Sequence, residues 1–189
     1  MKFFISLLLM ISFSSFAEDD HHNHDHSHDH TKEENSKKDK KSLDAHVHGV
    51  SILNLAQDMK QLSFEFEMPG FDVVGFEYKA KKKEDIKKVR NALGILSDYK
   101  NMIDVPASAN CKEEKSSTKV INEGSHSEFI SQYLLICEKI SSIKNIQIKY
   151  FDSFPFSKEL NINLITKNKK MAQTINRQDN IINVDGYFN

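Results

Sequence analysis

The stretch LSFEFEM, Leu62–Met68, alternates large apolar residues with polar ones over its whole length. Successive side chains of a β-strand point to opposite faces, so the pattern predicts a strand that buries its four apolar side chains and leaves its two glutamates in water. Pro69-Gly70 follows directly and is expected to end this strand.

More strands are predicted on either side of this stretch. Val50 to Leu55 carries apolar residues on both faces, which is typical of a central strand, and Gln57–Gln61 suits a hairpin connection to the next one. The remaining predicted strands are Phe129–Cys137, Ile143–Tyr150 and Leu160–Ile165. Hairpin-like pairs therefore recur, which favours an antiparallel sheet.

One segment has a helical pattern. From Lys83 to Ile103, apolar residues recur at steps of three or four and form one stripe, and Pro106 prevents much continuation. The stripe consists of Ile86, Val89, Leu93, Leu96 and Ile103. We therefore predict the α+β class, as a single domain whose mainly antiparallel sheet is covered by one long helix and preceded by a disordered His-rich arm.

The chain divides into three parts. Residues 1–17 are predicted to be a secretory signal peptide, with Lys2 before an apolar run that is too short to span a membrane, and Ala17 at the cleavage site. We expect no stable membrane insertion after cleavage. Residues 18–42 contain no aromatic or branched apolar residue, so we expect a disordered arm and charged linker. Residues 43–189 suffice for one folded domain.

Charge and cysteine content narrow the class of protein. The 26 basic and 27 acidic residues nearly cancel, and no basic patch is interleaved with aromatic residues, so a nucleic-acid partner is not expected. The chain has two cysteines, Cys111 and Cys137. In an oxidising compartment such a pair favours one disulfide, and the alternative is a pair of thiolate zinc ligands.

Histidine is the most unevenly distributed residue, since eight of the nine histidines lie in two N-terminal segments. The first segment alternates histidine with aspartate and contains His21, His22, His24, His26, His28 and His30. Neutral imidazoles beside carboxylates predict binding of metal, zinc first. Because only neutral imidazole binds metal, binding should weaken as the pH falls through about 6.

The second segment belongs to the predicted domain. His46 and His48 are two residues apart at the start of a strand, so their side chains leave the same face. The remaining histidine, His126, precedes another predicted strand. Zinc needs about four ligands, so a carboxylate could complete the set. The candidates are Asp44, Glu77 and Glu128. The alternative is that these are ordinary surface histidines at strand ends.

No catalytic pattern is present, because the sequence contains no G-x-S-x-G, H-E-x-x-H or phosphate-binding glycine loop. We therefore predict a binding protein and not an enzyme. Three alternatives stay open: a periplasmic buffer or chaperone for nickel, copper or cobalt, an adaptor protein with incidental histidines, and a hydrolase that uses bound zinc.

Several short motifs occur together in one order. They are the His-rich arm, Ala45-His46-Val47-His48-Gly49, Met68-Pro69, Gly75-Phe76-Glu77, Cys111, His126, Cys137 and Phe151-Asp152-Ser153-Phe154-Pro155. In these motifs the chain resembles the ZrgA-like family of periplasmic zinc-uptake proteins of Gram-negative bacteria. The resemblance implies a soluble, secreted zinc-binding protein. It implies a zinc ABC transporter, or the binding protein of that transporter, as a partner.

The resemblance also implies a ligand set. It gives His46, His48 and His126 as zinc ligands, with Glu77 as a further candidate. In the family the Gly-Phe-Glu motif usually continues with a histidine, and the corresponding residue here is Tyr78. The expected mechanism is capture of zinc by the arm and the domain, followed by delivery to the transporter.

Overall fold

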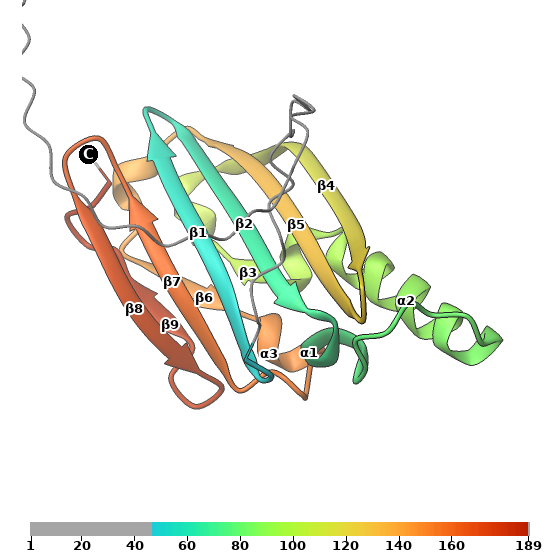
Figure 1. Ribbon diagram of the computed structural model, residues 1–189. Coiled ribbons are helices and arrows are strands. Elements are labelled where there is room, and N and C mark those ends of the chain that lie inside the picture. The colour runs from blue at the N-terminus through green and yellow to red at the C-terminus, as the bar shows by residue number, and fades with distance from the viewer. Residues whose placement is uncertain (1–46, 189) are drawn as a thin grey trace, which may run out of the picture. The chain divides into compact units, whose positions relative to one another are not determined.

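The computed structural model describes residues 47–188, which form two β-sheets and a few short helices (Figure 1). The strands are β1 (Val50–Asp58), β2 (Gln61–Pro69), β3 (Ile103–Asp104), β4 (Cys111–Glu123), β5 (His126–Cys137), β6 (Asn145–Ile148), β7 (Glu159–Ile165), β8 (Lys170–Asn176) and β9 (Ile181–Asn183). The α-helices are α1 (Gly70–Val74), α2 (Lys83–Leu96) and α3 (Tyr150–Ser153), and the 3-10 turns are η1 (Tyr99–Asn101), η2 (Ala107–Ala109) and η3 (Ile140–Ser142). No helix of residues 47–188 is long and apolar enough to cross a membrane.

The main sheet has six strands in the order β4-β5-β2-β1-β7-β8. Neighbouring strands are antiparallel except β1 and β7, which run parallel, with Leu53 of β1 opposite Ile162 of β7. The predicted antiparallel character therefore holds for most of the sheet, but the sheet is mixed. The parallel pair arises because the chain passes through the covering layer between β5 and β7 and returns at the starting end of β1.

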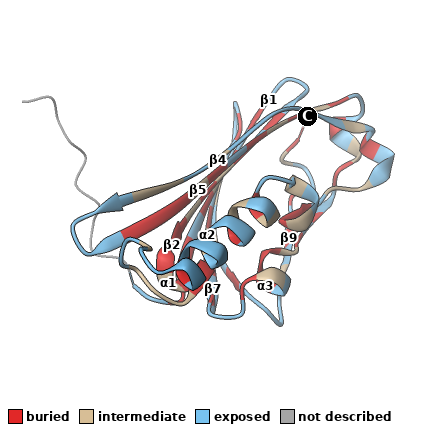
Figure 2. Cartoon of the chain, turned by 90° about the vertical axis from the view of Figure 1, so that its right-hand side faces the viewer, coloured by how far each residue is buried: buried red, intermediate tan, exposed pale blue. Residues whose placement is uncertain are grey.

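β2 confirms the alternation that predicted it. Its four apolar side chains have no exposed surface and form the middle of the core, and the strand ends at Pro69 as expected. β1 is central in the sheet, but only one of its faces is buried, since Ile52 on the other face is 36% exposed. The predicted central position is therefore confirmed, while among residues 47–188 the covering elements lie on one side of the sheet only (Figure 2).

Those covering elements are α1, α2, α3 and the second sheet, of order β3-β6-β9 (Figure 2). The predicted strand Ile143–Tyr150 is shorter than expected and belongs to this second sheet as β6, whereas Tyr150 opens α3. β3, β4, β8 and β9 were not predicted. The fold is mostly β-structure, with the core between the two layers.

The predicted long helix is the main error. α2 ends at Leu96, because the carbonyl oxygen of Leu96 accepts hydrogen bonds from the hydroxyls of Tyr133 and Thr118, at 2.5 and 3.1 Å, and no helical N–H is paired with it. The backbone amide of Lys100 instead donates a hydrogen bond to the side chain of Asp98, and this bond caps the start of η1. Ile86, placed in the buried stripe, is 42% exposed.

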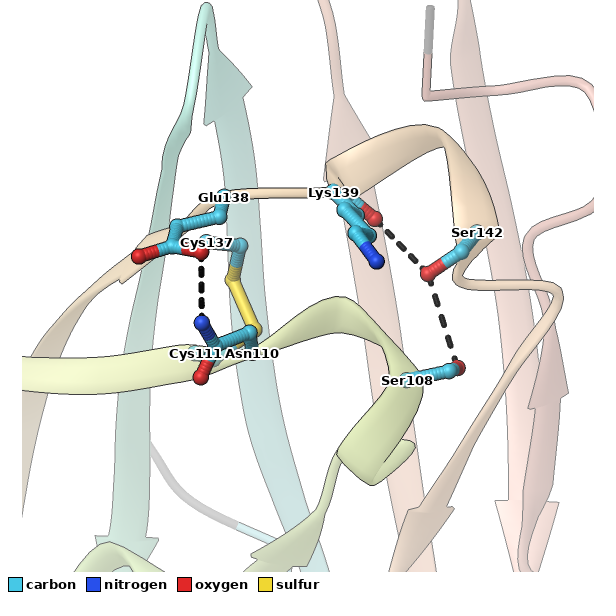
Figure 3. The surroundings of a disulfide bond; sticks show 7 residues. All are labelled: Ser108, Asn110, Cys111, Cys137, Glu138, Lys139 and Ser142. Atoms are coloured by element: carbon cyan, nitrogen blue, oxygen red, sulfur yellow. Dashed lines mark hydrogen bonds between the residues drawn. A yellow bond between two sulfur atoms is a disulfide. The ribbon is translucent and has the colours of Figure 1, made fainter.

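The two cysteines form a disulfide, as predicted from the residues alone (Figure 3). Cys111 opens β4 directly opposite Cys137 at the end of β5, so the bond closes one end of this strand pair. Beside it, the side-chain amide of Asn110 donates a 2.5 Å hydrogen bond to Glu138, and Ser142 donates to the Lys139 carbonyl at 2.7 Å. The cysteines are therefore not thiolate ligands in this structure.

Candidate metal site

Three predicted site residues meet at the opposite end of the main sheet. His48 lies two residues before the start of β1, His126 is the first residue of β5, and Glu77 follows α1. Because β1 begins, β2 ends and β5 begins at this same end, segments far apart in the sequence converge there. We call His48, Glu77 and His126 the histidine cluster.

Glu77 lies between the two imidazoles. Nδ1 of His126 is 2.7 Å from Oε2 of Glu77 and forms a hydrogen bond with it, and Nε2 of His48 is 3.1 Å from Oε1. The side chain of Glu77 is only 12% exposed, whereas the two histidines are about half exposed, at 54% and 51%. Oε1 is buried and has no hydrogen-bond partner among the described residues. The carboxylate is thus shielded by two rings that face solvent.

The charge state of Glu77 follows from these neighbours. Burial opposes ionisation and would raise the pKa of Glu77, but the hydrogen bond with His126 and the interactions with His48 outweigh it, so its pKa lies below the ordinary value of 4.5. Glu77 is therefore ionised at neutral pH. An ionised carboxylate only accepts hydrogen bonds, so Nδ1 of His126 carries the proton of that bond.

His48 is positioned by the stacking of its imidazole and by backbone hydrogen bonds of the next residue, Gly49. Its imidazole stacks on Phe71 of α1, with ring centroids 4.6 Å apart and planes within 10° of parallel. The amide of Gly49 donates a 2.6 Å hydrogen bond to Oδ1 of Asp72, and the carbonyl of Gly49 accepts from two backbone amides at the start of β7. The strand opening that carries His48 is thus fixed from both sides.

Asp72 is a fully buried carboxylate at the centre of this arrangement. Its Oδ2 accepts a 2.9 Å hydrogen bond from the hydroxyl of Ser51, and that hydroxyl also pairs with Tyr150 at 2.8 Å. Burial raises the pKa of Asp72, while the hydrogen bonds from Gly49 and Ser51 oppose this shift. Asp72 therefore ties α1 to the beginning of β1, and α1 leads directly to Glu77.

Gly75 explains how the chain reaches Glu77 from α1. It ends α1 in the left-handed conformation, with φ of 82°, which residues with a Cβ rarely adopt. A Cβ at this position would also lie 2.9 Å from a ring carbon of Phe156, which packs on Phe71. The positive φ favours glycine here, so Gly75 of the Gly-Phe-Glu motif has a structural role in leading the chain from α1 to Glu77.

Tyr78 does not belong to the cluster. Its ring stacks on Phe76, with centroids 4.6 Å apart, and its hydroxyl donates a 3.1 Å hydrogen bond to Asp85 of α2. Burial and the neighbouring Asp85 carboxylate raise the pKa of Tyr78. The position where the sequence resemblance leads us to expect a histidine is therefore occupied by a side chain bonded to α2.

The structure thus brings together three of the predicted ligands. Asp44, His46 and the six histidines of the N-terminal segment lie outside the described residues, and Glu128 is buried within β5. Among residues 47–188, no group of three or more His, Cys, Asp or Glu side chains is already arranged to hold a metal ion. The sequence analysis missed Phe71 and Asp72. A lone acid inside the apolar run Phe71–Val74 was the signal that could have revealed Asp72.

Comparison with known proteins identifies the family. A family model described as ZrgA family zinc uptake protein matches residues 45–184, which include the histidine cluster, the disulfide and the core of the fold. A search of curated proteins finds no match. The match covers more than half of the chain, so this protein belongs to the ZrgA family of zinc uptake proteins, and its function is related to zinc.

Proposed function

We propose that this protein captures zinc in the periplasm and passes it on for uptake across the inner membrane. In this proposal the histidine cluster, together with His46, binds one Zn²⁺ on the folded domain. The His-rich segment of residues 18–30 collects further ions and raises their concentration near the domain. Zinc is the cargo, and no chemical reaction is part of the mechanism.

One observation carries the proposal: a buried, ionised carboxylate is flanked by two half-exposed imidazoles, one from the turn before β1 and one from β5. Nitrogen and oxygen ligands of a tetrahedral zinc, at about 2.0–2.2 Å from the ion, lie roughly 3.3–3.6 Å from each other. The separations in the cluster, 2.7 and 3.1 Å, are slightly shorter, so a small outward movement of the exposed imidazoles would admit the ion. Oε1 of Glu77, which is buried and has no hydrogen bond among the described residues beyond its 3.1 Å ion-pair contact with His48, would gain a metal ligand bond in the same step.

The contacts of Glu77 with the two imidazoles would also hold the site together before an ion binds. His126 and His48 satisfy or approach the carboxylate oxygens in the absence of zinc, which avoids a buried and wholly unpaired charge. Zinc bound between Glu77 and His126 would displace the proton from Nδ1 of His126. In a neutral imidazole that proton would move to Nε2, and an imidazolium would release one proton to solvent.

A fourth ligand is required because the cluster supplies three. His46, two residues before His48, is the residue that we assign. The carboxylate of Glu77 would lower the net charge of the site with its bound ion. The two histidines of the cluster are half exposed. An exposed site of this kind favours release to a partner over permanent retention.

The test is a competitive zinc titration of two forms of the protein, one beginning at Glu18 and one at Leu43. Both should bind one ion at the histidine cluster, and the longer form should bind additional ions more weakly. In the shorter form, His48→Ala, His126→Ala and Glu77→Ala should each weaken zinc binding by about 100-fold. The matched control Glu114→Ala removes an exposed carboxylate of β4 and should leave the affinity unchanged.

One result would contradict the proposal, and a second result bears on the alternative metals. If the form beginning at Leu43 binds no zinc, the domain has no site. If copper(II) or nickel(II) is retained by the variants as tightly as by the unchanged protein, those metals use other residues, and the buffer hypothesis gains no support from the cluster. Induction of the protein by zinc limitation, and its recovery in the periplasmic fraction, would test uptake and location.

A further inference from the structure

A surface groove lies beside the histidine cluster, between the segment that follows Glu77, the first half of α2 and the far end of β4. Its larger part is a cavity of about 350 Å³ lined by Tyr78, Lys79, Lys81, Lys82, Asp85 and Gly124. A smaller part of about 180 Å³ continues over Phe76, Ile86, Val89 and Val120. We call the two parts together the α2 groove.

The floor of the α2 groove is apolar. Phe76, Val89 and Val120 are partly buried against the core, while Tyr78 and Ile86 are 52% and 42% exposed. Exposed large apolar residues that adjoin one another, with polar residues around them, are typical of a surface that contacts another molecule. The exposure of Ile86 contradicts its predicted burial and leaves this apolar surface open on α2.

The rim of the groove is basic. Residues 79–90 contain seven lysine or arginine residues and two acids, although the whole chain has a net charge of −1. Three of these lysines line the groove, and Lys88 lies over the Phe76 ring at 5.9 Å. The acid in the lining, Asp85, accepts the hydroxyl hydrogen bond of Tyr78. The charge around the opening is therefore complementary to an acidic ligand.

The groove and the histidine cluster share two segments of chain. Tyr78 and Lys79 directly follow Glu77, and Ser127, which lines the groove, directly follows His126. A molecule bound in the groove would consequently contact chain segments that directly adjoin Glu77 and His126. A role of the groove in metal exchange rests on the function proposed above.

We infer that the α2 groove binds an acidic segment, carrying at least one apolar or aromatic side chain, of the protein that exchanges zinc with the histidine cluster. Carboxylates of the segment would pair with the lysines of the rim, and its apolar side chain would cover the floor. The chain's own His/Asp segment, residues 18–30, is acidic but has no aromatic or branched apolar residue. It cannot fill the floor, and this difference favours a separate partner.

The experiment uses three short fluorescent peptides and the protein that begins at Glu18. The first peptide is acidic with a central phenylalanine, the second has serine in place of phenylalanine, and the third has lysine in place of each acid. Fluorescence anisotropy at about 50 mM salt should show binding of the first peptide, with the other two weaker by about tenfold or more.

Two double variants locate the binding. Lys79→Glu with Lys82→Glu reverses charge at the groove and should weaken binding of the first peptide by about tenfold or more. The single variant Ile86→Ser removes an apolar side chain of the floor and should weaken binding of this peptide by about fivefold. Lys167→Glu with Lys170→Glu makes the same charge change on exposed residues near the other end of the sheet and should have no effect. All of these substitutions are on exposed side chains and should leave the fold unchanged.

The inference is overturned if the first peptide does not bind or if both double variants weaken it equally. It is also overturned if the serine peptide binds as tightly as the first, because the floor is then unused and the His/Asp segment becomes the better occupant. A zinc titration separates this outcome from the proposed function. The protein with Lys79→Glu and Lys82→Glu should bind zinc as tightly as the unchanged protein. If the unchanged domain itself binds no zinc, that result contradicts the proposed function and does not test the groove.

Discussion

The two ends of the β4–β5 strand pair are held together by different kinds of interaction. At one end Cys111 lies opposite Cys137 and the strands are joined covalently. At the other end Glu123 lies opposite His126, and the neighbouring contacts are hydrogen bonds and ion pairs between ionisable groups. The two ends are about 36 Å apart, the length of eleven steps along a strand.

The difference shows how stability and binding are kept in separate places. In the chain-entropy model a disulfide that closes the loop between Cys111 and Cys137 stabilises a protein by about 3–4 kcal/mol. Partly exposed ion pairs such as those of His48 and His126 contribute only about 0–1 kcal/mol each. The cluster end can therefore exchange protons for metal with little effect on the fold, because the other end and the core hold the strands together.

The largest effect is expected from removal of the covalent end. Replacement of both cysteines, Cys111→Ala with Cys137→Ala, should lower the free energy of unfolding by about 3–4 kcal/mol, because the unfolded chain regains the freedom that the disulfide removes. Zinc affinity, measured where the variant is still folded, should stay unchanged. Urea unfolding and zinc titration measure the two quantities, and a comparable loss in both would show that the two ends are coupled.

A smaller effect is expected at the base of the cluster. Asp72→Ala removes the acceptor of the buried Gly49 amide and of Ser51, so the free energy of unfolding should fall by about 1–3 kcal/mol. Because Gly49 adjoins His48, zinc binding by the form beginning at Leu43 should weaken by about tenfold.

Asp72→Asn is the matched control for that variant. An asparagine oxygen can still accept from Gly49 and its amide can donate to the Ser51 hydroxyl, so zinc affinity should be largely restored while the negative charge is absent. Equal zinc affinity in Asp72→Ala and the unchanged protein would show that the position of His48 does not depend on Asp72. Full loss in both variants would indicate that the charge, and not the hydrogen bonds, is required.

Local sequence patterns predicted the parts of the molecule in which each residue's environment depends on its immediate neighbours. The alternation of Leu62–Met68 depends on one buried and one exposed face, and β2 has both. The disulfide was predicted because export leaves few other uses for two cysteines. His48 and His126 were singled out because histidine is rare elsewhere in the chain.

The errors occur where distant residues decide the outcome. β4 is mostly exposed along its thirteen residues, so it lacks an alternating pattern, and its pairing with β5 defines it instead. α2 stops at Leu96 because hydroxyls from β4 and β5 take its last carbonyl. The parallel neighbour of β1 and the contact of Asp72 with Gly49 likewise depend on tertiary structure. Glu77 was one of three candidate carboxylates and the one that the family motif also contains, but its position between two imidazoles required the fold.

The smallest predicted effect concerns Glu77 in the absence of metal. Its contacts with His126 and His48 outweigh the effect of burial and hold its pKa below 4.5, so the stability it contributes is present above that pH and is lost as the pH falls through the lowered value. Urea unfolding of Glu77→Gln should therefore differ from the unchanged protein by less than about 1 kcal/mol at about pH 5, and the difference should vanish toward about pH 2. Glu114→Gln, on exposed β4, should show no such trend. A constant difference down to low pH would mean that Glu77 stabilises this end through packing and not through its charge.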